Sequence, residues 1–215
     1  MKTADWYDED YFERGRETGK SGTFNGYTWR PDLSFPLAGG IMDFCNLHRH
    51  ARILDFGCAK GYLVRAFRWL HRNAYGCDWS EYAISQAPED VREFLYICEN
   101  PADVHYAPDG NGRWDLIIAK DVMEHQSEEN LSKLLRLFNL RTEALLVIVP
   151  LGDGKRHLIP YLEEEISHDL CKPFDWWLAK METHFPNVAS AHTWPGIKPQ
   201  WAKSHPLGNA IFHAW

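Results

Sequence analysis

Residues 53–62, ILDFGCAKGY, have the pattern of a strand that breaks into a glycine turn and then a helix. The apolar run reaches an acid, Asp55, and Gly57 and Gly61 follow it. Glycine lets the backbone of such a turn approach a ligand closely, and it lets the next helix start tightly against the strand. In α/β proteins this arrangement binds nucleotide-like ligands. The turn therefore predicts a nucleotide cofactor site.

A second acid follows the glycine turn at the sequence separation that is typical of a ribose-binding carboxylate. Asp78 ends the next apolar segment, about 20 residues after Gly57, where carboxylates accept hydrogen bonds from ribose hydroxyls. The turn itself reads GCAKG, with Ala59 in the middle place. A dinucleotide pyrophosphate needs the more glycine-rich GxGxxG turn to reach the helix amides. The pattern therefore favours an adenosyl cofactor without phosphate over a nicotinamide dinucleotide.

The elements that would position these residues alternate along the chain. Apolar runs predict strands at residues 51–56, 74–78, 94–98, 114–119 and 143–149. Amphipathic segments predict helices at residues 38–48, 61–71, 80–87, 127–139 and 173–184, and two late strands follow at 188–194 and 209–215. Strands separated by helices of this length imply right-handed βαβ units. We therefore expect an α/β fold with a mostly parallel sheet.

Two segments depart from this alternation. Residues 1–37 are rich in aromatic and charged residues and end in the proline-bounded RPDLSFP, which predicts an N-terminal arm or cap made of a short helix and irregular chain. Residues 38–215 form the predicted main domain. Within it, residues 150–172 are punctuated by Pro and Gly and carry mixed charge, which indicates an inserted loop on the substrate side.

Composition argues against several classes of partner. The chain has 23 Lys and Arg against 30 Asp and Glu, a net charge of −7, and no basic run, so nucleic acid is not expected as a partner. The apolar run at 144–151 is too short to span a bilayer, so we expect no membrane partner and a soluble, cytoplasmic protein. The five cysteines form no CxxC pair, and we expect reduced thiols. No metal site is expected, because HRH at 48–50 and DVH at 103–105 lack a third ligand at suitable spacing.

Four motifs in order carry a resemblance to a known family. DFGCAKG at 55–61 resembles the first motif of the class I S-adenosylmethionine-dependent methyltransferases. GCDWS at 76–80 is similar to the end of that family's second strand, WDLIIAKDVMEH at 114–125 to its fourth strand and following loop, and ALLVIVP at 144–150 to its fifth strand. The resemblance covers residues 38–215. It implies a Rossmann-like, doubly wound sheet of seven strands, mostly parallel, with an antiparallel C-terminal hairpin.

The resemblance also implies a set of cofactor-binding residues. Around the methionyl part of S-adenosylmethionine it implies the first motif, namely Asp55, Phe56, Gly57, Cys58 and Gly61. It implies Asp78 on the ribose, Trp79 against adenine and Lys120 near the sulfonium. Glu99, Asn100 and Asp103 compete for the contact with the adenine amine, and Asn100 is included in the predicted site.

Methyl transfer is an in-line displacement, so the protein mainly aligns the acceptor with the sulfonium and excludes water. A hydroxyl or amine acceptor must also lose a proton, and histidine is the natural base near neutral pH. His125 closes DVMEH after the fourth strand, and His168 lies in EISHD before the aromatic PFDWW. The second segment is similar to a substrate-side element of some bacterial small-molecule and glycan methyltransferases, with Glu165 and Ser167 in place of Asp and Thr.

His125 and His168 are therefore the candidate catalytic residues, although each could instead be held by a local hydrogen bond. The prediction is an S-adenosylmethionine-dependent methyltransferase acting on a small-molecule or carbohydrate acceptor, with O-methylation preferred. Two alternatives stay open at this point: an NAD(P)-dependent oxidoreductase, and a non-catalytic module that binds an adenosyl cofactor. Oligomeric state does not follow from the sequence.

Overall fold

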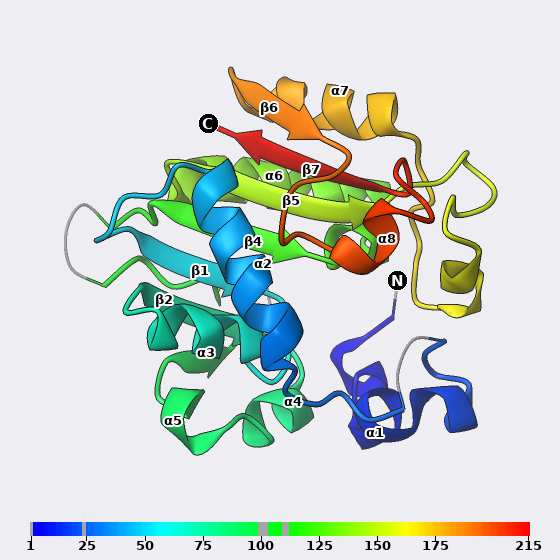
Figure 1. Ribbon diagram of the computed structural model, residues 1–215, viewed down its shortest axis with the longest axis horizontal. Helices are drawn as coiled ribbons and strands as arrows, with labels where there is room; N and C mark the ends of the chain where they lie inside the picture. Colours follow the sequence, from blue (N-terminus) through cyan, green and yellow to red (C-terminus); the bar gives the residue numbers. More distant parts are fainter. Residues whose placement is uncertain (1, 23–24, 99–102, 109–111) are drawn as a thin grey trace.

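The computed structural model describes residues 2–22, 25–98, 103–108 and 112–215. Seven strands form one sheet in the order β3-β2-β1-β4-β5-β7-β6 (Figure 1). They are β1 (Arg52–Phe56), β2 (Asn73–Asp78), β3 (Leu95–Ile97), β4 (Leu116–Lys120), β5 (Leu145–Pro150), β6 (Val188–Ala191) and β7 (Asn209–Ala214). The first five pair in parallel, whereas β7 runs antiparallel to both β5 and β6. The predicted fold class is confirmed, and residues 192–208 join the antiparallel pair β6 and β7.

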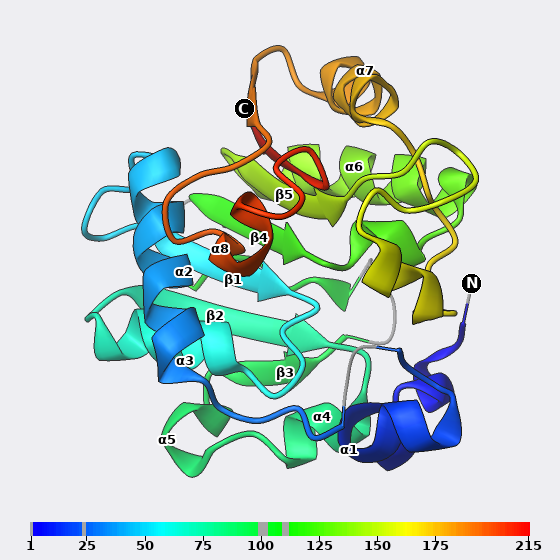
Figure 2. The same ribbon diagram turned by 45° about the vertical axis from the view of Figure 1, so that its right-hand side comes forward.

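Helices cover both faces of the sheet (Figures 1 and 2). On one face lie α2 (Pro31–Phe44) and α3 (Tyr62–Trp69), and on the other lie α6 (Glu128–Arg141) and α7 (Phe174–His184). Successive strand residues point to opposite faces. Ile53 accordingly packs in the core beside α2 and α3, and Leu54 in the core beside α6 and α7. Both faces are buried, which explains why β5 reads as an uninterrupted apolar run.

Two of the predicted helices differ from those observed. The helix expected at 38–48 begins at Pro31, so the RPDLSFP segment forms its first turns rather than irregular chain. Proline suits the first helical turn because its φ is already helical and its missing N–H is not needed there. The helix expected at 80–87 is shorter, α4 (Glu81–Ser85), and a separate turn, α5 (Glu89–Arg92), follows Pro88. The predicted boundary between residues 37 and 38 falls inside α2. The division into an arm and a main domain stays a prediction.

The N-terminal arm and the 150–172 loop lie together beyond the carboxyl ends of the parallel strands (Figures 1 and 2). The arm holds η1 (Ala4–Trp6) and α1 (Glu9–Thr18), and the loop holds η4 (Pro160–Glu164). The Ser21 hydroxyl donates to the Glu165 carboxylate, and a Cβ on Gly22 would overlap Glu164. The two segments therefore contact each other directly. In the parts of the chain that the structure describes, we find no helix with the length and apolar character needed to cross a bilayer.

The turn after β1 is built from three residues in the left-handed backbone region. Gly57, Ala59 and Gly61 have φ of 78°, 50° and 73°. The Ala59 N–H donates to Asp78 Oδ2 at 2.8 Å, and the N–H groups of Gly57 and Cys58 donate to the carbonyl of Cys77. These hydrogen bonds to the end of β2 hold Ala59 in a conformation that costs a residue with a Cβ roughly 1–2 kcal/mol.

We expect Ala59→Gly to raise the free energy of unfolding by about 0.5–1 kcal/mol, because glycine adopts this φ without strain but loses more chain entropy on folding. Urea denaturation of both proteins measures the difference. Ala66→Gly is the matched control, since this buried alanine lies inside α3. There glycine should lower the free energy of unfolding by about 1 kcal/mol. A destabilised Ala59→Gly protein would contradict the strain at this turn.

Candidate active site

A cavity of about 610 Å³ lies beyond the carboxyl ends of β1, β2 and β4. Among the residues predicted from sequence, it is lined by Phe56, Gly57, Asp78, Trp79, Lys120 and His125. The arm adds Tyr7, Tyr11, Phe12 and Tyr27. These arm residues also pack together as an aromatic cluster with Trp79. The arm aromatics therefore both line the cavity and seal the fold beside it.

Asp78 is the best-defined polar group of this cavity. Its Oδ1 accepts from the Ser80 N–H and its Oδ2 from the Ala59 N–H, both at 2.8 Å. Burial raises the pKa of this carboxyl, and the hydrogen bonds from Ser80 and Ala59 oppose that shift. Carboxylate oxygens have further lone pairs, so Asp78 can still accept hydrogen bonds from a ribose.

A second cavity, of about 540 Å³, meets the first one. It contains Asp55 and Cys58 from the first motif and His168 from the loop. Other parts of its walls come from the arm, from the start of α3, from residues 120–125, from η4 and from the segment around α8 (Pro199–Ala202). Six residues line both cavities, namely Tyr11, Tyr27, Gly57, Lys120, Asp121 and His125. Of the predicted cofactor residues of the first motif, Phe56 lines the first cavity, Asp55 and Cys58 line the second, and Gly57 lines both.

Two of the predicted positions that the structure describes, Gly61 and Asp103, line neither cavity. Gly61 lines neither cavity and instead lets α3 start against β3, because a Cβ there would collide with Leu95. Asn100 and Glu99 fall outside the described residues. Asp103 is exposed and lines neither cavity. Cys98, which sequence reasoning missed, lines the first cavity at the end of β3.

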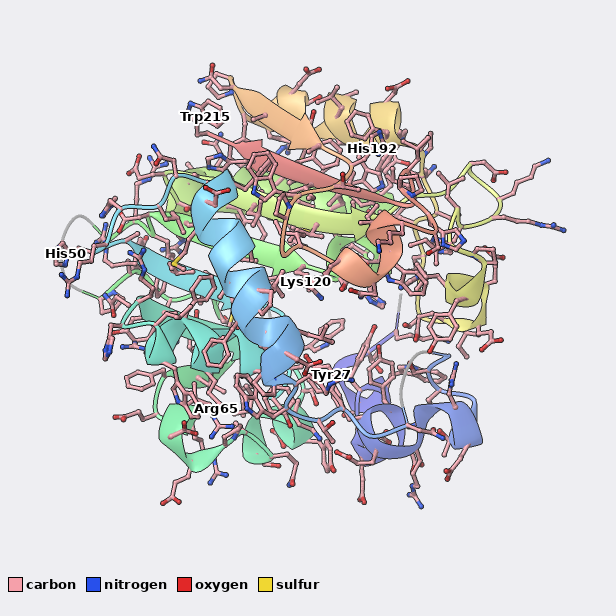
Figure 3. All side chains as sticks on the ribbon, in the orientation of Figure 1. Tyr27, His50, Arg65, Lys120, His192 and Trp215 are labelled. Atoms are coloured by element: carbon pink, nitrogen blue, oxygen red, sulfur yellow. The ribbon has the colours of Figure 1, made fainter. Side chains whose placement is uncertain are left out.

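Two charged groups from the predicted set meet near the shared wall. Burial raises the pKa of Asp55 to about 7, and the nearby ammonium of Lys120 opposes that shift. Lys120 donates to Asp121 Oδ2, and Lys198 donates to Asp121 Oδ1. Burial alone would raise the pKa of Asp121, but the two ammonium groups hold it well below its usual range. The Lys120 side chain, which is labelled near the centre of Figure 3, is thus fixed by an ionic bridge.

The sequence reasoning did not identify Asp121 or its partner Lys198. Asp121 has a left-handed φ of 55° directly after β4, an unusual conformation for a residue with a Cβ and one that is frequent at functional sites. The only signal in the sequence was an acid at the end of a strand. Lys198 lies 77 residues further along the chain and could not be assigned from local pattern.

The structure brings the two predicted catalytic histidines together. The rings of His125 and His168 have centroids 4.8 Å apart. His125 Nδ1 lies 3.1 Å from the carbonyl oxygen of Ser167 and 3.4 Å from the hydroxyl of Tyr7. His168 Nδ1 lies 3.2 Å from His157 Nε2. Burial lowers the pKa of His125, and burial together with the neighbouring histidines lowers that of His168 to about 2, so both rings are neutral at pH 7.

The chain matches the model of the family described as a methyltransferase domain over residues 35–197. A search among curated proteins found no match. Among solved structures, a SAM-dependent methyltransferase from Archaeoglobus fulgidus aligns with a TM-score of 0.64 and 12% identity, covering 89% of this chain and 95% of that chain. A TehB-like SAM-dependent methyltransferase from Corynebacterium glutamicum gives 0.57 and 15%, covering 82% and 86%. Phosphoethanolamine N-methyltransferase 2 from Haemonchus contortus, in complex with S-adenosyl-L-methionine, gives 0.66 and 16%, covering 100% and 60%.

The structural neighbours are too distant in sequence to show more than a common fold. The family model covers most of the chain, and it does not favour an oxidoreductase or a non-catalytic cofactor-binding module. The glycine turn, the acid that ends β2 and the strand order agree with that match. The chain belongs to the class I S-adenosylmethionine-dependent methyltransferases.

Proposed function

We propose that the protein transfers the methyl group of S-adenosylmethionine to a hydroxyl of a small-molecule or carbohydrate acceptor in the second cavity. The observation that carries this proposal is the pair of adjacent cavities with shared lining residues, which include Gly57, Lys120, Asp121 and His125. A methyl donor and its acceptor need such an arrangement, because in-line displacement requires the two reactants side by side and shielded from water.

The adenosine end of the cofactor occupies the first cavity in this proposal. Asp78 accepts hydrogen bonds from the ribose hydroxyls, and the indole of Trp79 lies against adenine. Support comes from the position of both residues on the wall of that cavity and from the two backbone amides that orient Asp78. The methionyl end extends past Gly57 toward Asp55, whose carboxylate pairs with the cofactor's ammonium group. The sulfonium then lies at the shared wall.

The size and lining of the second cavity support a small acceptor. A space of about 540 Å³ is in the usual range for small-molecule sites, and the arm and the 150–172 loop cover it. Its walls carry the aromatic rings of Tyr161 and Trp201 beside charged groups such as Arg30 and Glu165. Aromatic faces with nearby polar groups suit a sugar or another hydroxylated molecule. The net charge of −7 opposes a nucleic-acid acceptor.

The reaction forms a bond between the acceptor oxygen and the methyl carbon, and it breaks the bond between that carbon and sulfur. The electron pair of the broken bond goes to sulfur, which becomes the neutral thioether of S-adenosylhomocysteine. The acceptor oxygen loses its proton. That proton passes to the imidazole of His125 or of His168, which is supported by their neutral rings and by their position on the wall of the second cavity.

Asp78→Asn should weaken binding of S-adenosylhomocysteine by roughly ten- to a hundredfold, the cost of losing hydrogen bonds to a charged acceptor. Titration calorimetry measures the affinity. Asp90→Asn is the control, because Asp90 lies on α5 and pairs with Arg65 on the surface. This variant should bind S-adenosylhomocysteine with the affinity of the wild type. Equal affinity in the Asp78 variant would remove this residue from the ribose site.

The affinity for S-adenosylhomocysteine should rise as the pH increases from about 6 to about 7. Burial raises the pKa of Asp55 to about 7 in the free protein, so below that pH its carboxyl must lose a proton before it can pair with the ligand's ammonium group. The rise approaches tenfold per pH unit well below the pKa and levels off above it. Calorimetry across this range, repeated on Asp55→Asn, isolates the contribution of Asp55. An identical pH profile in the variant would contradict it.

His125→Ala and His168→Ala should each lower turnover by roughly a hundredfold or more, while S-adenosylhomocysteine affinity stays within about threefold of wild type. A screen of sugars and hydroxylated small molecules with radiolabelled S-adenosylmethionine supplies the acceptor for this measurement. The control is His50→Ala, since His50 lies on the surface far from Lys120 (Figure 3). Full turnover in both histidine variants would refute their role, and methylation of amines only would refute O-methylation.

A further inference from the structure

The side chain of one buried acid near the shared wall has no hydrogen-bond partner among the described residues. This acid is Glu124, in η3 (Met123–His125); it is fully buried, and both of its carboxylate oxygens are unbonded within the part of the chain that the structure describes. Its backbone carbonyl accepts from the N–H groups of Asp169 and Leu170, both at 2.8 Å, so the residue is fixed between β4 and the loop. The ammonium groups of Lys120 and Lys198 are bonded to Asp121. Burying a carboxylate without a partner is costly, and a bound cation would remove that cost.

Two histidines complete a set of metal-ligating groups around this acid. One ligand atom from each of Glu124, His125 and His168 lies within 4.8 Å of the other two, and Glu124 Oε1 is 3.9 Å from His168 Nε2. His125 donates from Nδ1 to the Ser167 carbonyl, which leaves the lone pair on Nε2. His168 Nδ1 is 3.2 Å from His157 Nε2, and in the tautomer of His168 that donates from Nδ1 the lone pair is likewise on Nε2. Such outer hydrogen bonds orient imidazole ligands in metal sites.

We propose that Glu124, His125 and His168 form a binding site for a divalent transition-metal cation at the wall of the second cavity. Ligand atoms about 2.1 Å from a metal lie roughly 3–4 Å from one another, so shifts of about 1 Å or less would close the observed set around an ion. Two imidazoles and one carboxylate with open positions suit Zn²⁺, Co²⁺, Mn²⁺ or Fe²⁺. All three residues line the second cavity, so the open positions face the space assigned to the acceptor.

The metal site itself does not depend on the proposed function. Only its effect on the acceptor hydroxyl rests on that function. A cation at this place supplies Lewis acidity toward the acceptor hydroxyl and makes its proton easier to lose. His125 and His168 would then hold the ion instead of taking the proton, and the proton of the polarised hydroxyl would pass to a water molecule. The site could not be predicted from the sequence, because its ligands come from two segments more than 40 residues apart.

Cobalt binding tests the site without any need for turnover. Protein treated with a chelator and then titrated with Co²⁺ should develop visible absorption bands that saturate at one equivalent, and Zn²⁺ should displace them. Glu124→Gln, which keeps the shape of the side chain, and His168→Gln should each weaken Co²⁺ binding at least tenfold. His50→Gln, a surface histidine in HRH at 48–50 (Figure 3), should leave it unchanged.

S-adenosylhomocysteine affinity, measured on the same samples, shows that each variant is folded. The proposal is overturned if wild type shows no saturable Co²⁺ bands, or if Glu124→Gln and His168→Gln bind Co²⁺ as wild type does. In that case methylation of a hydroxyl acceptor by chelator-treated protein would leave the proposed function standing. Conversely, specific Co²⁺ binding together with methylation of amines only would keep the metal site and refute the hydroxyl acceptor.

Discussion

The carboxylate of Asp78 holds together the three segments on which the site depends. It accepts hydrogen bonds from the backbone of Ala59, in the turn after β1, and of Ser80, at the start of α4. The hydroxyl of Ser80 in turn donates to the carbonyl of Tyr7 in the arm. The glycine turn, the end of β2 and the arm are therefore positioned by one connected set of hydrogen bonds. The left-handed conformation of Ala59 is maintained as part of that set.

The part of the molecule that could be predicted from sequence is the part that local pattern determines. Parallel strands place their carboxyl ends at one edge, so Asp78, Trp79 and Lys120 could be assigned to a common site from their places after apolar runs. The helix at Pro31 was misjudged because proline signals both irregular chain and a helix start. The bridge from Asp121 to Lys198 escaped prediction, because only the tertiary fold brings those residues together.

Burial sets the chemical character of the second cavity. It keeps His125 and His168 neutral and brings the carboxyl of Asp55 to a pKa of about 7. The arm and the 150–172 loop both contribute to this burial, and the hydrogen bond from Ser21 to Glu165 joins them. The shifted protonation of these groups therefore depends on the burial to which these two segments contribute.

The first part of the arm lies outside the segment that the family model matches. The family model begins at residue 35, whereas Tyr7, Tyr11 and Tyr27 of the cavity walls precede that point. The described residues of the arm contribute no strand to the sheet. Substitutions there can therefore reshape the walls of both cavities while the sheet and the glycine turn stay intact. In evolutionary terms, changes confined to the residues before position 35 alter these cavity walls without touching the segment that the family model matches.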